Sequence, residues 1–160
     1  MKIAVFAVGR MKSGPEKELA DRYFDRFAKT GPAFGLEFSG VEEIAESRAQ
    51  GVAERRLDES VKLRARVGLG TVLILLDERG KSFGSQDFAQ KIAAWRDGGQ
   101  RTVLIAIGGP DGHDPALRDE AALTLSFGAA TWPHQLVRIM LAEQLYRAAT
   151  ILSGHPYHRS

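Results

Sequence analysis

The stretch TVLIAIGGPDGHDP, residues 102–115, decides the class of fold. Its first six residues are apolar and partly β-branched, a composition typical of a strand covered on both faces. The turn GGPDG, residues 108–112, ends that strand, and Asp114-Pro115 has the cap-then-proline pattern that begins a helix. TVLILL, residues 71–76, predicts a second buried strand of the same kind. Buried strands that alternate with helices predict an α/β fold.

Apolar periodicity extends this pattern in both directions along the chain. The last helix, which Pro133 opens, is apolar over more than half of its length, so we expect it to be buried on several sides. The segment 123–127 is apolar and fits either a strand or a helix. The other expected elements are strands at 2–8 and 34–38, helices at 15–31, 52–67, 85–98 and 114–122, a loop at 40–51, a polar turn at 77–84 and a tight loop at 128–132. The sequence thus predicts one domain, residues 1–160, with a mostly parallel sheet covered by helices on both faces.

The composition is that of an ordinary globular protein without disulfides. The 160 residues contain no cysteine, which excludes a disulfide framework and thiolate metal sites. No apolar run reaches the roughly 18 residues that span a bilayer, so we expect a cytoplasmic protein without a membrane partner. The net charge of +2 is small for a protein that clamps naked RNA. Any RNA binding must therefore use local charge or recognition of shape.

Three segments rich in glycine or proline follow the predicted core elements, at residues 77–84, 108–112 and 128–133. In open α/β sheets, ligands bind at the carboxyl ends of the strands, where these segments would lie. Glycine lets backbone groups approach a ligand closely, as a flat adenine ring requires. Each segment could instead form only a tight turn, but three of them after consecutive elements favour a pocket.

Several common kinds of site are excluded by the motifs that the chain lacks. GGPDG does not fit the GxGxxG pattern of dinucleotide folds, and no GxxxxGK[ST] phosphate loop is present. No GxSxG motif supports a hydrolase. His155 and His158 have a metal-like spacing but no acidic residue near them in sequence, so we expect no metal site.

The C-terminal HPYHRS, residues 155–160, gathers two imidazoles, a phenol and a guanidinium after the long apolar helix. A disordered polar end is the alternative, since termini usually fray. Tyr157 has the shape to stack on a base, and Arg159 has the charge to hold a phosphate or a carbonyl. His158 has a side chain that accepts a proton near neutral pH. Composition alone favours the disordered end, although these residue types also suit a binding role.

Taken together, several strings resemble one known family. LDERGK (76–81), IGGPDG (107–112), WPHQLVRIMLAEQLYRA (132–148) and HPYHR (155–159), with AVGR (7–10), are similar to the RlmH/YbeA family of the SPOUT class. Its members are bacterial methyltransferases that act on N3 of a pseudouridine in large-subunit ribosomal RNA. The resemblance covers essentially the whole chain in order.

The resemblance implies a fold and a set of partners that spacing does not show. It implies a deep trefoil knot in the C-terminal half, about residues 71–160, where the methyl donor S-adenosylmethionine binds without a metal. It implies a homodimer in which the partner chain completes each site, and a substrate pseudouridine in a hairpin loop of 23S rRNA on assembled ribosomes. The donor-binding residues it implies are Leu76, Gly108, Gly109, Phe127, Gly128, Ala129, Ala130, Thr131, Trp132 and Pro133.

The resemblance also suggests roles for the tail, where His155, Tyr157, His158 and Arg159 are the catalytic candidates. We expect His158 to remove the N3 proton, Arg159 to stabilise charge on a uracil oxygen, and Tyr157 to orient the base. Another expected role is that of His134, which would position the donor loop. Arg138 and Glu143 are expected to make satisfied polar contacts at a dimer seam, and Glu143 also to pair with Arg147.

Three other functions remain as alternatives. A knotted methyltransferase that acts on transfer RNA would share the fold, but HPYHR matches the ribosomal family. A non-catalytic ribosome-binding factor would be expected to lose the glycine loops or the tail, and both are present. A flavodoxin-type nucleotide-binding domain is disfavoured because the phosphate-binding motifs are missing.

Overall fold

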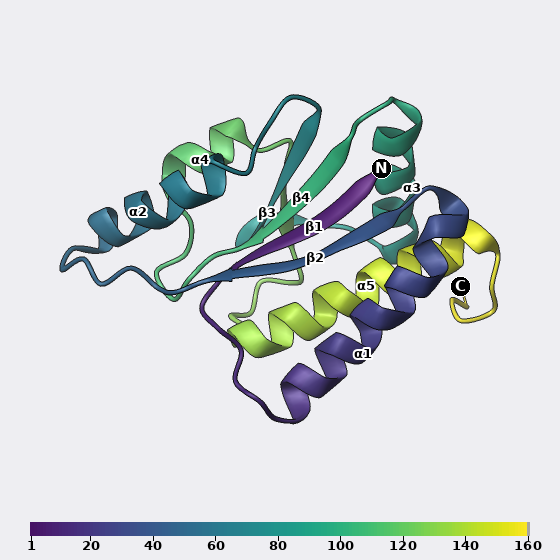
Figure 1. Cartoon of the computed structure of the whole chain (residues 1–160), viewed down its shortest axis with the longest axis horizontal. Helices are drawn as coiled ribbons and strands as arrows, with labels where there is room; N and C mark the ends of the chain where they lie inside the picture. The colour runs from purple at the N-terminus through teal and green to yellow at the C-terminus, as the bar shows by residue number, and fades with distance from the viewer. Residues whose placement is uncertain (160) are drawn as a thin grey trace.

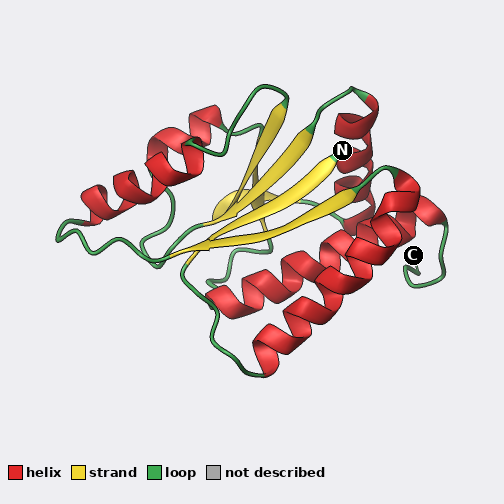
Figure 2. Cartoon of the chain, viewed as in Figure 1, coloured by secondary structure: helices red, strands yellow, loops and turns green. Residues whose placement is uncertain are grey.

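A twisted parallel sheet forms the centre of the molecule in the computed structural model, which describes residues 1–159 (Figures 1 and 2). The strands in this part of the chain lie in the order β2-β1-β4-β3-β5, and every pairing between them is parallel. The strands are β1 (Lys2–Val8), β2 (Glu37–Ile44), β3 (Thr71–Ser82), β4 (Thr102–Ile107) and β5 (Leu123–Ser126). The helices are α1 (Pro15–Thr30), the short 3-10 helix η1 (Gly31–Phe34), α2 (Val52–Arg64), α3 (Ser85–Asp97), α4 (Pro115–Glu120) and α5 (His134–Ser153).

Both faces of the sheet are covered by helices, as the continuous apolar strands predict. In β3, Val72, Ile74 and Leu76 join the core on the side of α1, α3 and α5, whereas Leu73 and Leu75 join the core on the other side. The second core includes Leu63 of α2 and Leu117 of α4. Figure 1 shows α2 and α4 on one side of the sheet and α1, α3 and α5 on the opposite side. The α/β sheet with both faces covered is therefore confirmed.

The last helix is buried along much of its length. Leu141 and Leu145 of α5 are fully buried, and Ala142 and Ala149 let neighbouring elements approach closely. The helix packs beside α1 and α3 (Figure 1). These contacts explain why its sequence is apolar around most of its circumference.

Two boundaries differ from the sequence-based expectations. The second strand is β2 at Glu37–Ile44, not 34–38, so part of the predicted loop at 40–51 is a strand. It is an edge strand that pairs only with β1 among the described strands. Its sequence EFSGVEEI is largely polar, so a pattern of apolar residues does not identify it. The polar turn predicted at 77–84 is instead the second half of β3, where Lys81 and Ser82 pair with β5 after an irregularity.

Smaller differences concern the ends of helices. The helix α2 ends at Arg64 rather than Val67, and the ambiguous segment 123–127 contains the strand β5. Pro133 stands immediately before α5 rather than inside it. Asp114 caps α4 as predicted, because its carboxylate accepts a hydrogen bond from the Ala116 N–H at 3.2 Å. None of the helices in residues 1–159 is both long enough and apolar enough to cross a membrane.

Candidate functional site

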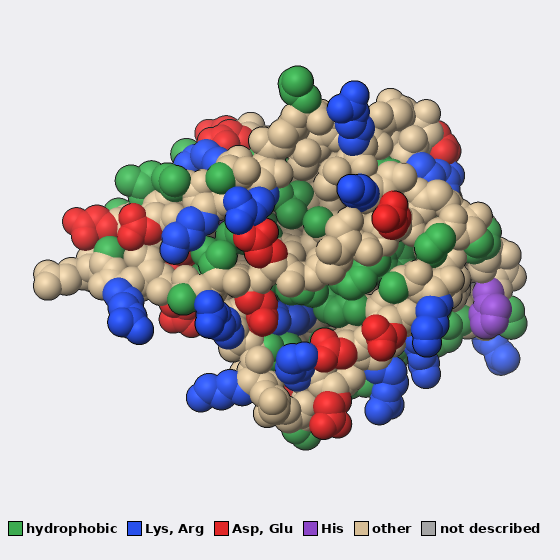
Figure 3. Space-filling model, viewed as in Figure 1, with side chains coloured by type: hydrophobic (Ala, Val, Ile, Leu, Met, Phe, Trp, Pro, Cys, Tyr) green, Lys and Arg blue, Asp and Glu red, His purple; other side chains and the backbone are tan. Residues whose placement is uncertain are grey.

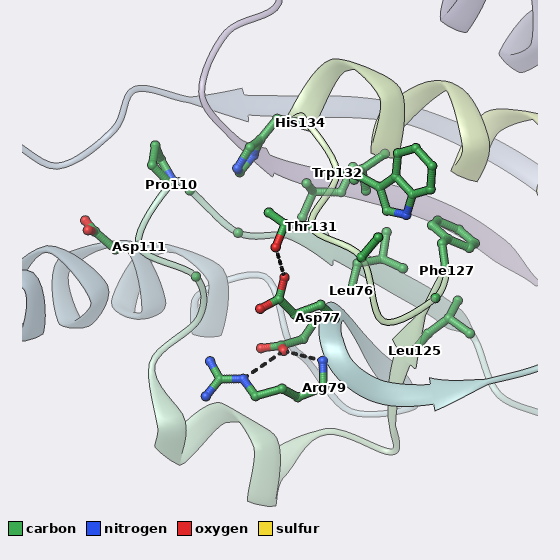
Figure 4. A pocket seen from close by; sticks show the side chains of 18 residues that line it. Leu76, Asp77, Arg79, Pro110, Asp111, Leu125, Phe127, Thr131, Trp132 and His134 are labelled. Atoms are coloured by element: carbon green, nitrogen blue, oxygen red, sulfur yellow. Dashed lines mark hydrogen bonds and ion pairs between the residues drawn. The ribbon is translucent and has the colours of Figure 1, made fainter.

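A hollow of about 250 Å³ lies at the carboxyl ends of β3, β4 and β5 (Figure 4). The three glycine- or proline-rich segments singled out in the sequence all contribute to its wall. Of the predicted donor-binding residues, Leu76, Gly108, Gly109, Phe127, Gly128, Ala130, Thr131 and Trp132 line the hollow, whereas Ala129 and Pro133 do not. The parallel register explains why these segments meet, because Leu76 in the middle of β3 pairs with Ile107, the last residue of β4.

Apolar side chains, two aromatic rings among them, form one part of the walls, and polar side chains form the rest. Leu76, Ile107 and Leu125 come from the strand ends, and Val137 comes from the first turns of α5. Figure 4 shows Trp132 and Phe127 on one side of the space, with Pro110 and Asp111 across from them. An apolar slot edged by backbone groups suits a flat heterocycle.

Carboxylates at the mouth of the hollow were missed by the sequence-based list of site residues. Asp77 and Glu78 follow directly after the apolar half of β3, and Asp111 lies in the GGPDG turn. The Thr131 hydroxyl donates to Glu78 at 2.6 Å, which joins the loop before α5 to β3. Their position at the end of buried strands was the signal that pointed to them.

Asp77 and Asp111 keep their charge through arginine partners. Burial raises the pKa of the Asp77 carboxyl, but hydrogen bonds from the Arg79 N–H and the Arg118 guanidinium outweigh burial and hold that pKa below its usual range. The Asp111 carboxylate accepts from Arg55 Nε at 2.6 Å, which lowers its pKa as well. The site thus presents anionic groups next to an apolar slot.

The turn after β4 is fixed by a buried histidine. His113 is 7% exposed, and its Nε2 lies 3.2 Å from the Leu76 carbonyl oxygen, so Nε2–H donates in the neutral tautomer. Burial lowers the pKa of His113 and keeps the ring neutral at pH 7. A Cβ on Gly108 would lie 3.2 Å from His113 Cε1 and from the Gly112 carbonyl carbon, so a side chain there would require this turn to shift.

The loop between β5 and α5 is held by its own hydrogen bonds. The Ser126 hydroxyl donates to the Gly128 carbonyl at 2.8 Å and accepts from the Gly128 N–H at 3.1 Å. Gly128 has a φ of 116°, which disfavours any residue with a side chain. This loop carries Trp132 and leads into His134, which lines the same hollow. The predicted role of His134 in positioning the loop stays a prediction.

His134 is half-buried where the loop enters α5. Burial lowers the pKa of the His134 imidazole, and the charge of Arg138 acts in the same direction, against the opposing charge of Glu46. Arg138 itself is buried and is paired with Glu43, and its Nη2 donates to the Gly9 carbonyl at 3.2 Å. Arg138 is therefore satisfied within its own chain, whereas its predicted place at a dimer seam stays a prediction.

The tail residues lie at the opposite end of α5 from the hollow. The Tyr157 hydroxyl donates to Glu143 at 3.0 Å, and its ring centroid lies 4.8 Å from that of Tyr146. Arg147 pairs with Glu143, as predicted, and its guanidinium carbon lies 4.7 Å from the Tyr157 ring centroid. Burial, followed by hydrogen bonds with Tyr23 and Glu143, raises the pKa of the Tyr157 phenol above its ordinary range.

The length of α5 separates the tail from the hollow of the same chain. The helix has 20 residues, which span about 30 Å. The tail folds back only to Glu143, nine positions after His134 and thus about 14 Å from it along the axis. His155 and Arg159 are exposed, and Tyr157 and His158 are partly buried. The catalytic and donor-binding residues predicted from the sequence therefore do not form one site within a single chain.

The chain has a parallel sheet covered by helices on both faces, with glycine-rich loops around a hollow at the carboxyl edge. This arrangement is that of α/β folds that bind ligands at the carboxyl ends of their strands. A family described as "Predicted SPOUT methyltransferase" matches residues 1–158. The chain is 69% identical to "Ribosomal RNA large subunit methyltransferase H" of Mesorhizobium japonicum and 61% identical to the protein of that name in Brucella anthropi, each over 100% of both chains. The chain belongs to this ribosomal RNA large subunit methyltransferase H family of SPOUT methyltransferases.

Solved structures with a distant likeness include the SpoU methyltransferase AviRb from Streptomyces viridochromogenes, in complex with the cofactor AdoMet. The sequences are 16% identical, the match covers 90% of this chain and 56% of that chain, and the TM-score is 0.42.

Replacing His113 by glutamine should flatten the dependence of stability on pH. Because burial lowers the pKa of folded His113, the unfolded chain binds a proton below about pH 6.5 that the folded chain does not. The free energy of unfolding should therefore fall as pH drops below 6.5, by up to about 1.4 kcal/mol per pH unit from this group. His113→Gln, which keeps a donor for the Leu76 carbonyl, removes that contribution.

Urea denaturation between pH 7.5 and 5 measures this slope. The exposed His155→Gln serves as control and should give a curve parallel to that of the wild type. Parallel curves for His113→Gln and the wild type would contradict the assignment of a buried neutral imidazole.

Gly108→Val should weaken binding of a nucleoside ligand in the hollow at least about tenfold, because its side chain displaces residues 112–113 and the Leu76 contact. Calorimetry with S-adenosylmethionine measures the affinity. Gly68→Ala is the control, since a Cβ there meets no atom within 4 Å. Equal affinities of Gly108→Val and the wild type would show that the ligand binds elsewhere.

Proposed function

We propose that this protein transfers a methyl group from S-adenosylmethionine to N3 of a pseudouridine in a hairpin loop of 23S rRNA, on assembled ribosomes in the cytoplasm. The observation that carries the proposal is the hollow at the carboxyl edge, in a chain 69% identical over its full length to a ribosomal RNA large subunit methyltransferase H. The glycine loops and the HPYHR tail are both present.

The chemistry of the hollow fits the proposed donor. S-adenosylmethionine supplies an activated methyl group on a sulfonium centre, together with an adenine ring and a cationic ammonium. The apolar walls near Leu76 and Phe127 suit the adenine, and Gly108 and Gly128 bring backbone groups to the wall of the hollow. The Glu78 carboxylate offers negative charge to the cationic centres. The low pKa of His134 keeps that imidazole neutral, so it adds no repulsion.

Two finer features of the fold belong to the same proposal. We infer that residues 71–160 form the deep trefoil knot of the SPOUT class and that the loops around the hollow belong to this knot. We also infer a homodimer that forms over the face of α1 and α5, where a broad hollow is lined by apolar side chains that include Tyr23, Ile139 and Met140. Leu19 and Leu136 on these helices are 36% and 40% exposed, which supports an apolar contact there.

In the proposed dimer, the tail of each chain completes the site of its partner. The distance along α5 supports this arrangement, since the tail does not reach the hollow of its own chain. Pseudouridine N3 carries a proton that must leave before the nitrogen attacks the methyl group. We assign proton removal to His158, stabilisation of the uracil oxygen to Arg159 and stacking on the base to Tyr157, with His155 beside them. The docking of Tyr157 on Glu143 and Arg147 sets the starting position of the tail.

The mixed charge of the protein surface suits a large, folded substrate. Positive and negative side chains are interspersed on the face of the protein in Figure 3, in keeping with the net charge of +2. A folded ribosome offers shape and protein surfaces as well as phosphates, so the enzyme needs no extended basic face.

The direct test is methyl transfer from labelled S-adenosylmethionine. Ribosomes that lack the modification, naked 23S rRNA and transfer RNA are incubated with the protein, and mass spectrometry maps the label. We expect one labelled pseudouridine in ribosomal RNA, formed best on assembled ribosomes. Label in transfer RNA alone would move the substrate to another RNA class, and no label in any RNA would indicate a non-catalytic binding factor.

A chain that ends at Gly154 should bind S-adenosylmethionine normally but methylate ribosomes at least about a hundredfold more slowly, because it lacks the proposed acid–base group. The αL cap of α5 at Gly154 is kept, so the helix should remain folded. Circular dichroism checks the fold, and calorimetry checks donor binding. Methylation by the truncated chain at the normal rate would show that the tail takes no part in the reaction.

A further inference from the structure

A second hollow, of about 380 Å³, adjoins the first at His134. The loop after β1 and the first turn of α5 form it, together with the segment that follows β2. Arg10, Glu46, Gln135 and Arg138 provide its polar lining, and His134 belongs to the walls of both hollows. Its volume lies within the range of small-molecule sites, about 300–1,000 Å³. The two hollows thus adjoin, and the His134 side chain forms part of the wall of each.

A buried ionic network fixes the loop that carries Arg10. Arg138 is 8% exposed and forms an ion pair with Glu43, and the Met11 N–H donates to the same carboxylate at 2.7 Å. Arg138 also donates to the Gly9 carbonyl at 3.2 Å. Burial raises the pKa of Glu43, but the hydrogen bonds from Arg138 and from the Met11 N–H outweigh burial and hold that pKa below its usual range. Residues on both sides of Arg10 are therefore held in place.

Arg10 differs from Arg138 because no carboxylate neutralises it. Arg10 is exposed, and no hydrogen bond or ion pair within residues 1–159 engages its guanidinium. A guanidinium binds phosphate through two parallel hydrogen bonds. The first turn of α5 borders the same space, and the N–H groups at the start of a helix also favour an anion. A fixed loop with a free cation therefore stands at the rim of a hollow.

The remaining polar groups suit a base rather than a second phosphate. Glu46 offers a carboxylate acceptor to a ring N–H, and Gln135 offers an amide that both donates and accepts. A nucleotide that enters with its phosphate on Arg10 would place its base towards His134, which also lines the donor hollow.

We propose that the second hollow is the subsite for the target nucleotide of the RNA, with Arg10 bound to a phosphate of that nucleotide. This inference rests on the proposed function and names where its substrate binds. The partner's tail would then close over the exposed side of the base. Arg10 is a substrate-binding residue in this scheme and takes no part in binding the donor.

The test compares Arg10→Ala with Arg101→Ala in the full-length protein on modification-deficient ribosomes. Arg101 is exposed immediately before β4, at the opposite edge of the sheet from both hollows, and serves as a matched loss of one positive charge. We expect kcat/KM of Arg10→Ala to fall about tenfold to a hundredfold, the size of one charge-assisted hydrogen bond, with an unchanged affinity for S-adenosylmethionine. Arg10→Lys should recover part of the loss, and Arg101→Ala should match the wild type. A kcat/KM of Arg10→Ala within twofold of the wild type would overturn the subsite.

A binding experiment separates failure of the subsite from failure of the proposed function. Uridine 5′-monophosphate is titrated into the protein saturated with S-adenosylhomocysteine, and backbone chemical shifts are followed. Shift changes at residues 9–11 and Gln135 that are lost in Arg10→Ala support the subsite even if the wild type methylates no ribosomal RNA. If the wild type is inactive on RNA and these residues do not shift, both the subsite and the proposed function are wrong.

Discussion

The pairing of β3 with β4 is the interaction on which the rest of the structure depends. The first half of β3 and the whole of β4 are apolar on both faces, and their register brings Leu76 beside Ile107, where β4 ends. The turn that follows β4 returns through His113, whose buried ring contacts the carbonyl of Leu76. One register thus positions the core, the edge of the sheet and two walls of the hollow. If one strand slipped by one residue, each of its side chains would move to the opposite face of the sheet.

The sequence predicts best where burial dictates composition. The runs at 71–76 and 102–107 are identifiable because a strand covered on both faces has no polar positions. The polar strand β2 and the second half of β3 could not be found this way, because their pairing depends on a neighbour distant in sequence. Asp77 and Glu78 lie in the segment 77–84 that the sequence singled out for the pocket, but they were not predicted as site residues because they looked like residues of a polar turn.

The roles of the tail could be proposed from the resemblance alone, since composition favours a frayed end. The structure adds a physical reason to look for the tail's target in another chain. Tyr157 docks on Glu143 and Tyr146, and the length of α5 keeps the tail away from the hollow that shares the helix. A site divided between two chains explains why one small domain can hold a donor at one end and a base-binding segment at the other.

The measurement that tests this account most directly uses two inactive chains together. One chain carries Gly108→Val, which damages the donor hollow but keeps the tail, and the other ends at Gly154. Co-expressed in equal amounts with distinct tags, they form mixed dimers in which the intact hollow of one chain meets the intact tail of the other. If the tail completes the partner's site, the mixture should methylate ribosomes at about a quarter of the wild-type rate, since one site in four is whole. No activity in the mixture, with mixed dimers present, would contradict a site shared between chains.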